Sequence, residues 1–197
     1  MKTFLKIFIF AVLFGLLAGC EKTAEFFENE TPDLKSAQPQ KITVPFEANL
    51  LGEIASIDWE AQECIEEGYF VRVIVETTGN ATHMGKVSLT FNFCSGGAPD
   101  PNIEGSKYTY AGSTADLIAA NGDVLYLSFD DGIVMNGRTD EHPDDVYEYW
   151  RTPVSVLGGT GRFEGATGDL SSDDYVTTDD QTHHRFYGKI TLVKGKK

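Results

Sequence analysis

The feature that most constrains the fold is a regular alternation of polar and apolar residues from Lys86 to Phe93. Apolar side chains occupy every second position of the stretch KVSLTFNF, and Lys, Ser, Thr and Asn fill the other positions. Successive side chains of a strand point to opposite faces, so a period of two predicts a strand with one buried face. We therefore expect Val87, Leu89 and Phe91 to face a core together with Phe93.

Short runs of the same kind recur along the chain, separated by Gly, Asn and Asp. Clear strands are predicted at 69–76, 124–129, 146–151 and 184–193, with others at 41–51 and 108–111 and a last hairpin beginning at 174–178. The Asn121-Gly122 pair before Val124 indicates a hairpin turn. A helix is predicted only at 59–67, with Asp58 as its N-cap.

This pattern predicts an all-β fold, either a sandwich or a barrel. We expect residues 41–197 to form a single antiparallel β-barrel domain of about eight strands. Closure would remove the exposed strand edges and leave an interior for side chains or for one small ligand.

Residues 1–20 predict a signal peptide that ends at Cys20. Lys2 and Lys6 precede the apolar run 7–17, which is shorter than the ~20 residues that a membrane-spanning helix needs. The ending Leu-Ala-Gly-Cys resembles the lipobox of bacterial lipoproteins, in which the cysteine is acylated and becomes the mature N-terminus. The alternative is an ordinary secretory signal whose cleavage site contains a cysteine. We expect lipidation at Cys20 and a location in the bacterial cell envelope, at the outer membrane.

Composition limits the partners of the exported chain. Residues 21–40 are rich in Glu, Thr, Pro, Ser and Lys and predict a flexible tether. Without residues 1–20 the chain carries 14 basic and 30 acidic residues, a net charge of −16, which disfavours nucleic acid as a partner. Acidic pairs such as Asp173-Asp174 fit either calcium ligands or solvated turns, and the lack of an EF-hand spacing favours turns. We expect neither a metal nor a cofactor.

The two remaining cysteines, Cys64 and Cys94, form an even pair in an exported protein, which favours a disulfide. The bridge would close a loop of about thirty residues and stabilise the fold by ~3–4 kcal/mol. The alternative is two buried free thiols.

Three patterns carry a family resemblance: GNATHMGK at 79–86, AANGD at 119–123 and GGTGRFEGATG at 158–168. Together they resemble the allene oxide cyclase and dirigent-like barrel proteins over about residues 71–192. The resemblance implies an eight-stranded barrel with a cavity, and a homo-oligomer. Its plant members hold a reactive, mostly apolar ligand in one conformation, but no catalytic residue of theirs can be transferred to this sequence.

The third pattern predicts a tight corner of the barrel, because glycines allow positive φ and close backbone approach. Phe163 would plug the barrel end and Arg162 would stay at its rim. The glycines of this corner motif are Gly158, Gly159, Gly161, Gly165 and Gly168.

The strand at 146–151 offers two alternative cavity faces. If Glu148 and Trp150 point inward, Glu148 is a buried acid that could serve as general acid or base. If Tyr147, Tyr149 and Arg151 point inward, they line the cavity and bind an acidic ligand. Surface packing is the third alternative.

Arg72 and His83 each have two interpretations, and His183 and His184 form an adjacent pair. Arg72 is either a buried partner of Glu76 or Glu148, or a residue at a strand edge. His83 is either an acid or base at the cavity mouth or a turn residue that bonds nearby backbone. His183 and His184 point to opposite faces if extended, and we expect both to be solvated.

Two functions are compatible with these patterns. The first is a membrane-anchored barrel, held by Cys20, that binds a small, partly apolar ligand or a protein partner without turnover. The second is an isomerase or cyclase acting on a lipid-derived or phenolic substrate, in which Glu148, Arg72 and Tyr147 converge in one pocket.

Overall fold

The computed structural model describes residues 39–195, so Cys20, the signal peptide and most of the tether lie outside the described residues. The strands are β1 (Lys41–Asp58), β2 (Val71–Ala81), β3 (Gly85–Gly97), β4 (Ser106–Tyr110), β5 (Ser113–Ala119), β6 (Val124–Phe129), β7 (Gly132–Asn136), β8 (Val146–Trp150), β9 (Pro153–Gly159), β10 (Thr167–Thr177) and β11 (Thr182–Val193). A short helix, α1 (Gln62–Glu66), and one 3-10 turn, η1 (Gly161–Phe163), complete the described part. No helix between residues 39 and 195 has the length and apolar character needed to cross a membrane.

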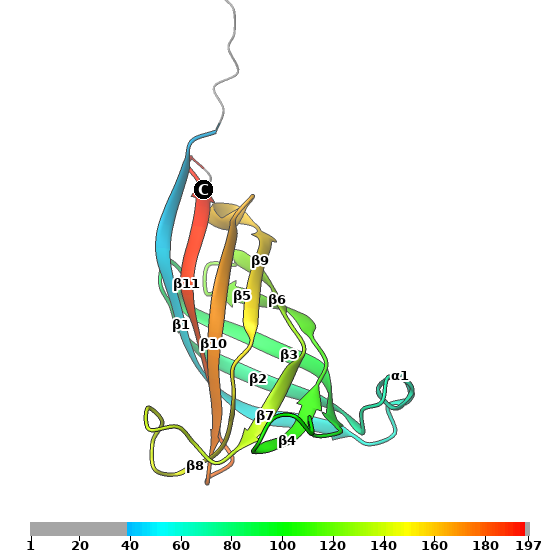
Figure 1. Cartoon of the computed structure of the whole chain (residues 1–197). Helices are drawn as coiled ribbons and strands as arrows, with labels where there is room; N and C mark the ends of the chain where they lie inside the picture. The colour runs from blue at the N-terminus through cyan, green and yellow to red at the C-terminus, as the bar shows by residue number, and fades with distance from the viewer. Residues whose placement is uncertain (1–38, 196–197) are drawn as a thin grey trace, which may run out of the picture. The chain divides into compact units, whose positions relative to one another are not determined.

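The strands form a closed antiparallel barrel of eight strands, as the sequence pattern predicts (Figure 1). The closed circuit runs β1-β2-β3-β5-β6-β9-β10-β11, and β11 pairs back with β1 from Lys41↔Val193 to Gly52↔Thr182. Each strand of this circuit therefore pairs with the next circuit strand along the chain, and the first strand pairs with the last. This closure leaves no free edge in the main circuit.

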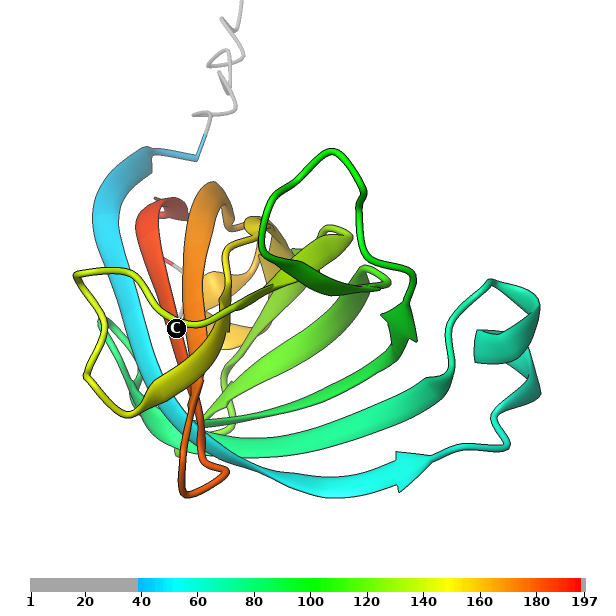
Figure 2. The same ribbon diagram turned by 60° about the horizontal axis from the view of Figure 1, so that its bottom comes forward.

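The three additional strands, β4, β7 and β8, are bent continuations of the barrel wall. The pairs β4/β5, β6/β7 and β8/β9 are each interrupted by two residues, at 111–112, 130–131 and 151–152. The bends are joined to one another, since the Gly112 N–H donates to Asp131 Oδ1 (2.6 Å) and the Asp130 N–H donates to the Pro153 carbonyl (3.3 Å). The barrel therefore has two ends with different walls, and the end with β4, β7 and β8 comes forward in Figure 2.

The hydrophobic core fills the end of the barrel formed by β5, β6 and β9. Leu117, Leu125 and Leu127 are fully buried there, and Phe163 of η1, 1% exposed, closes this end. The alternation over 86–93 is confirmed: the predicted apolar face is buried or packs against the core, and the four polar residues between are exposed.

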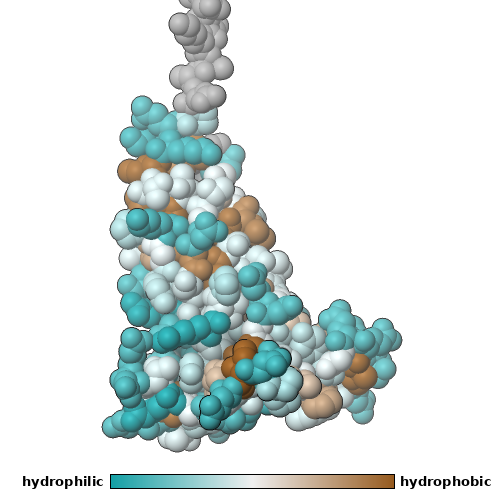
Figure 3. Space-filling model, viewed as in Figure 1, coloured by the Kyte–Doolittle hydropathy of each residue, from teal (hydrophilic) through white to brown (hydrophobic). Residues whose placement is uncertain are grey.

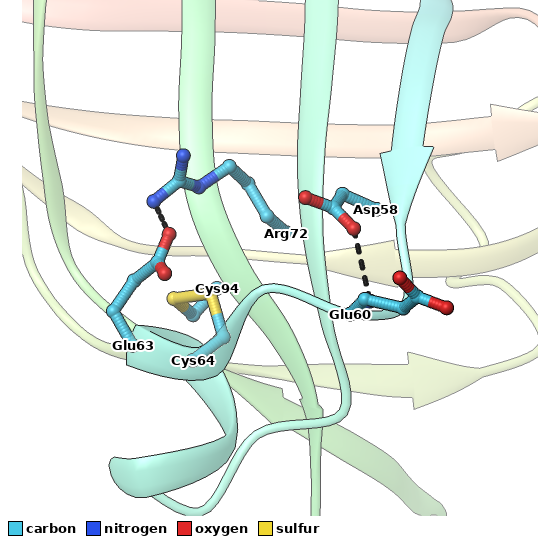
Figure 4. Close-up of a disulfide and its surroundings, with 6 residues drawn as sticks. All are labelled: Asp58, Glu60, Glu63, Cys64, Arg72 and Cys94. Carbon is cyan, nitrogen blue, oxygen red and sulfur yellow. Dashed lines mark hydrogen bonds and ion pairs between the residues drawn. A yellow bond between two sulfur atoms is a disulfide. The ribbon is translucent and has the colours of Figure 1, made fainter.

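Some element boundaries differ from the sequence prediction. Strand β10 begins at Thr167 rather than near 174, and β5, β7 and β9 were not predicted. Helix α1 begins after Ala61, so Asp58 is not its N-cap; Asp58 instead accepts a hydrogen bond from the Glu60 N–H (2.9 Å) within the preceding turn (Figure 4). The 124–129 strand and the hairpin turn at Asn121-Gly122, where Gly122 has φ 88°, are as predicted.

The predicted disulfide between Cys64 and Cys94 is confirmed, and the free-thiol alternative is wrong (Figure 4). It joins α1 to β3 with a Cα–Cα distance of 5.2 Å. We call residues 59–70, which include α1, the arm; it is also held by an ion pair between Glu63 and Arg72 of β2.

Candidate functional site

The end of the barrel bounded by β4, β7 and β8 contains a cavity of about 360 Å³. Its walls are mainly apolar and come from both long and short strands, including Val71, Val73 and Val75 of β2, Phe93 of β3 and Val134 of β7. The cavity thus begins where the packed core of the other end stops. Its volume lies near the lower end of the roughly 300–1,000 Å³ typical of small-molecule sites.

The rim of the cavity carries exposed apolar side chains. Trp59 and Phe70 of the arm are 68% and 67% exposed, and Ile54 and Ile57 near the end of β1 are also exposed. On the face shown in Figure 3 the apolar surface is broken into small areas between hydrophilic residues. The rim gives an apolar approach to the cavity.

Glu148 is the first polar group of the cavity. It is 6% exposed, because the alternation of β8 turns Val146, Glu148 and Trp150 inward. The Tyr108 hydroxyl donates to its Oε1 (3.2 Å), and Lys107 forms an ion pair with its Oε2. Burial raises the pKa of Tyr108, and the Glu148 carboxylate raises it further, so this hydroxyl stays a donor.

The second polar group is a pair formed by His184 and Asp174. These residues face one another across β11 and β10, with 3.2 Å between His184 Nδ1 and Asp174 Oδ1, and both side chains are 4% exposed. His184 Nε2 has no hydrogen-bond partner in the described part of the chain. A carboxylate only accepts, so the ring donates from Nδ1, and in the neutral ring Nε2 is then an acceptor on the wall of the cavity that both residues line.

Aromatic rings hold His184 in place. Its ring centroid lies 4.7 Å from that of Phe91 and 6.0 Å from that of Trp150. The expectation that His184 is solvated is therefore wrong, because its side chain is 4% exposed, and the expectation that Asp173-Asp174 forms a turn is wrong, because both residues lie within β10. His183 does point to the opposite face, where its ring stacks on Tyr175 at 4.6 Å.

A third polar group lies at the level of the wall bends. The hydroxyls of Tyr110 and Thr152 are hydrogen-bonded to each other, and the Thr152 N–H donates to Ser172 Oγ (3.0 Å). Burial raises the pKa of Tyr110. Thr182 also lines the cavity, and its Oγ1 has no hydrogen-bond partner among residues 39–195.

Most of the other candidate cavity residues lie outside the cavity, which corrects the alternative that placed them inward. Tyr147, Tyr149 and Arg151 share the outer face of their strand, and the Arg151 Nε donates to Asp173 (2.6 Å) on the outer surface. Arg72 likewise points outward to Glu63 rather than to Glu76 or Glu148 (Figure 4). The convergence of Glu148, Arg72 and Tyr147 in one pocket therefore does not occur.

His83 lies at the plugged end of the barrel, away from the cavity lining. It occupies the turn between β2 and β3 with φ 66°, and its Nε2 donates to the Pro45 carbonyl (3.0 Å). This contact fits the turn-forming interpretation of His83 and not that of an acid or base at the cavity mouth.

The corner motif surrounds Phe163 at the same end. Gly161 has φ 56°, and a Cβ there would collide with the Asp123 carboxylate, so the turn into η1 requires glycine. Arg162 stays at the rim, where its Nη1 donates to the His83 carbonyl (3.3 Å). The other motif glycines, Gly158, Gly159, Gly165 and Gly168, flank this turn in β9, the loop after η1 and β10.

Within residues 39–195 no group of three or more His, Cys, Asp or Glu side chains is arranged to hold a metal ion. No protein-family model matches the chain, and neither the curated proteins nor the solved structures give a match. The resemblance to the allene oxide cyclase and dirigent-like barrels rests on the three sequence motifs alone and stays a prediction.

Proposed function

We propose that this protein is an exported, lipid-anchored envelope protein whose barrel binds one small, predominantly apolar ligand without turning it over. The observation that carries the proposal is the cavity of about 360 Å³ in one end of a barrel whose other end is solidly packed. A barrel that only needed stability would gain more from filling both ends.

The lining suits an apolar ligand with few polar groups. Apolar walls such as those of Val73, Phe93 and Val134 favour a ligand that removes its own apolar surface from water. Buried polar groups, Glu148 among them, are few and held by neighbouring side chains, so they can orient a ligand. The closed strand circuit preforms the site, which reduces the ordering that binding must impose.

A small ligand is favoured over a protein partner, because the site is a recess inside the barrel rather than a flat patch. The exposed side chains of Trp59 and Phe70 lie at the rim of this recess. Export is supported by the Cys64–Cys94 disulfide, since such bridges persist in oxidising compartments.

Both tryptophans of the chain, Trp59 and Trp150, line the cavity, so ligand entry can be followed by intrinsic fluorescence. Titration with the neutral probe N-phenyl-1-naphthylamine should raise probe emission and quench tryptophan emission with one saturable site. Val176→Phe, which adds volume inside the cavity, should weaken binding at least about tenfold.

Leu157→Phe is the matched control, because Leu157 is 59% exposed on the outer face of β9. It should bind the probe as the wild type does. Thermal unfolding of both variants would show that the barrel is intact. Wild-type protein that shows no saturable binding, or a folded Val176→Phe variant that binds as tightly as Leu157→Phe, would contradict the proposal.

A further inference from the structure

Two buried polar atoms on side chains that line the cavity lack a partner within the described residues: His184 Nε2 and Thr182 Oγ1. Both residues belong to β11 and are separated by one position, so they share its inner face. His184 is 5% exposed and Thr182 is 3% exposed. Buried polar atoms are almost always hydrogen-bonded, so two orphans on one cavity wall indicate a ligand group that satisfies them.

The chemistry of the two atoms differs and is complementary to a hydroxyl group. Asp174 accepts a hydrogen bond from the Nδ1–H of His184, which in the neutral ring leaves Nε2 as an acceptor. Thr182 Oγ1 can both donate and accept. A ligand hydroxyl can donate to His184 Nε2 and accept from Thr182 Oγ1. An ether can only accept, and a hydrocarbon can do neither.

The charges that face the cavity exclude an anionic ligand. Two carboxylates, Asp174 and Glu148, line it, and the Lys107 ammonium that reaches this region is already paired with Glu148. The other titratable groups of the lining are His184, which is paired with Asp174, and the hydroxyls of Tyr108 and Tyr110, whose pKa values are raised by burial, so these hydroxyls stay neutral. A carboxylate ligand beside Asp174 would meet like charge in a site of low polarity.

We infer that the cavity recognises a neutral apolar alcohol, whose hydroxyl group donates to His184 Nε2 and accepts from Thr182 Oγ1. This inference rests on the proposed ligand-binding function and names its ligand class. Asp174 acts as a positioning residue that fixes the ring and its tautomer.

Four probes of similar size test the inference by displacement of N-phenyl-1-naphthylamine. They are 1-naphthalenemethanol, its methyl ether 1-(methoxymethyl)naphthalene, the hydrocarbon 1-methylnaphthalene and the carboxylate 1-naphthoate. The alcohol should bind about tenfold more tightly than the ether and the hydrocarbon, and the carboxylate should bind most weakly.

His184→Phe removes the acceptor and keeps an aromatic ring among Phe91 and Trp150. It should abolish the preference for the alcohol and leave the affinity for 1-methylnaphthalene within about twofold of wild type. His183→Phe is the matched control, because His183 is the adjacent residue on the outer face of β11. It should keep the full preference.

The comparison of probes on the wild-type protein needs no variant, so it decides the question even if His184→Phe does not fold. Equal affinity for the alcohol, the ether and the hydrocarbon would overturn the inference and leave the ligand-binding function intact. Tightest binding of 1-naphthoate would overturn it as well, because Nε2 would then carry a proton. If the reporter probe does not bind and no compound displaces it, the proposed ligand-binding function itself is contradicted.

Discussion

Gly52 makes room for two buried threonine side chains. It lies opposite Thr182 on β11 and Thr77 on β2, and a Cβ at this position would come within 2.6 Å of Thr182 Oγ1 and 2.7 Å of Thr77 Cγ2. We predict that Gly52→Ala lowers the free energy of unfolding by about 1–3 kcal/mol, because the added methyl group overpacks this site. Urea unfolding followed by tryptophan fluorescence measures the change.

Thr182→Ala provides the control for this prediction. Removing Oγ1 opens space beside residue 52, so the double variant Gly52→Ala/Thr182→Ala should lose less stability than the sum of the two single variants. Strict additivity, or a Gly52→Ala variant as stable as the wild type, would show that the barrel wall relaxes without strain.

The inward direction of His184 and Asp174 could have been predicted from the alternation of side chains along their strands. On β11, His184 is an even number of positions from the apolar residues Phe186 and Ile190, so the three share a face. On β10, Asp174 shares a face with Leu170 and Val176 for the same reason. Local composition instead favours solvated turns and loops, of which paired acids and paired histidines are typical. The contact between His184 and Asp174 depends on strand register, which the sequence pattern alone does not specify.

The inward face of β8 also depends on strand pairing, which the sequence pattern alone does not specify. Alternation separates Glu148 and Trp150 from Tyr147, Tyr149 and Arg151. It does not say which set is buried, because both sets contain aromatic and charged residues. The pairing Glu148↔Val176 and Trp150↔Asp174 with β10 decides the choice.

Among the elements, the bent strands were the hardest to predict. Strand 124–129 was predicted, but its continuation β7 was not, because Asp130-Asp131 has the composition of a strand end. In the barrel these residues form a bend and not a turn, with Gly112 bonded to Asp131 across the wall. A local signal cannot separate a bend from a chain reversal, since the difference lies in which strands pair on either side.

The arm is the element whose stability depends most on one bond. The Cys64–Cys94 disulfide joins it to β3, and the arm places Trp59 and Phe70 at the cavity rim. We predict that Cys64→Ala/Cys94→Ala lowers the free energy of unfolding by about 3–4 kcal/mol and speeds amide hydrogen exchange over residues 59–70 at native conditions. Hydrogen exchange measured by mass spectrometry separates the loss of overall stability from the local opening of the arm.

Strands β5 and β6 are the internal reference for that experiment, since their core residues Leu117 and Leu125 are fully buried at the far end of the barrel. Their exchange should change only through global unfolding. An arm that stays protected in the double variant would mean that Glu63–Arg72 and the packing of Phe70 suffice to hold it.

At the scale of the whole molecule, stability and binding are assigned to opposite ends of one barrel. The plugged end holds the packed core and the corner motif around Phe163, and the other end holds the cavity. The described chain also begins at the plugged end, where Lys41 pairs with Val193 and the Lys194 N–H donates to the Gln40 carbonyl (2.7 Å). The first described residues therefore lie at the end of the barrel opposite the cavity.

This arrangement suits a barrel that is attached through its N-terminal segment and receives its ligand at the other end. We predict that the protein, produced in a bacterium that acylates exported lipoproteins, incorporates an alkyne-tagged palmitate and fractionates with membranes, because Cys20 follows the lipobox-like Leu-Ala-Gly. Cys20→Ser should lose both the label and the membrane association. It should still bind N-phenyl-1-naphthylamine, since the barrel lies beyond the tether. A Cys20→Ser protein that keeps the label would place the acyl group on another residue, and a wild-type protein that is exported without the label would show that residues 1–20 act as an ordinary secretory signal.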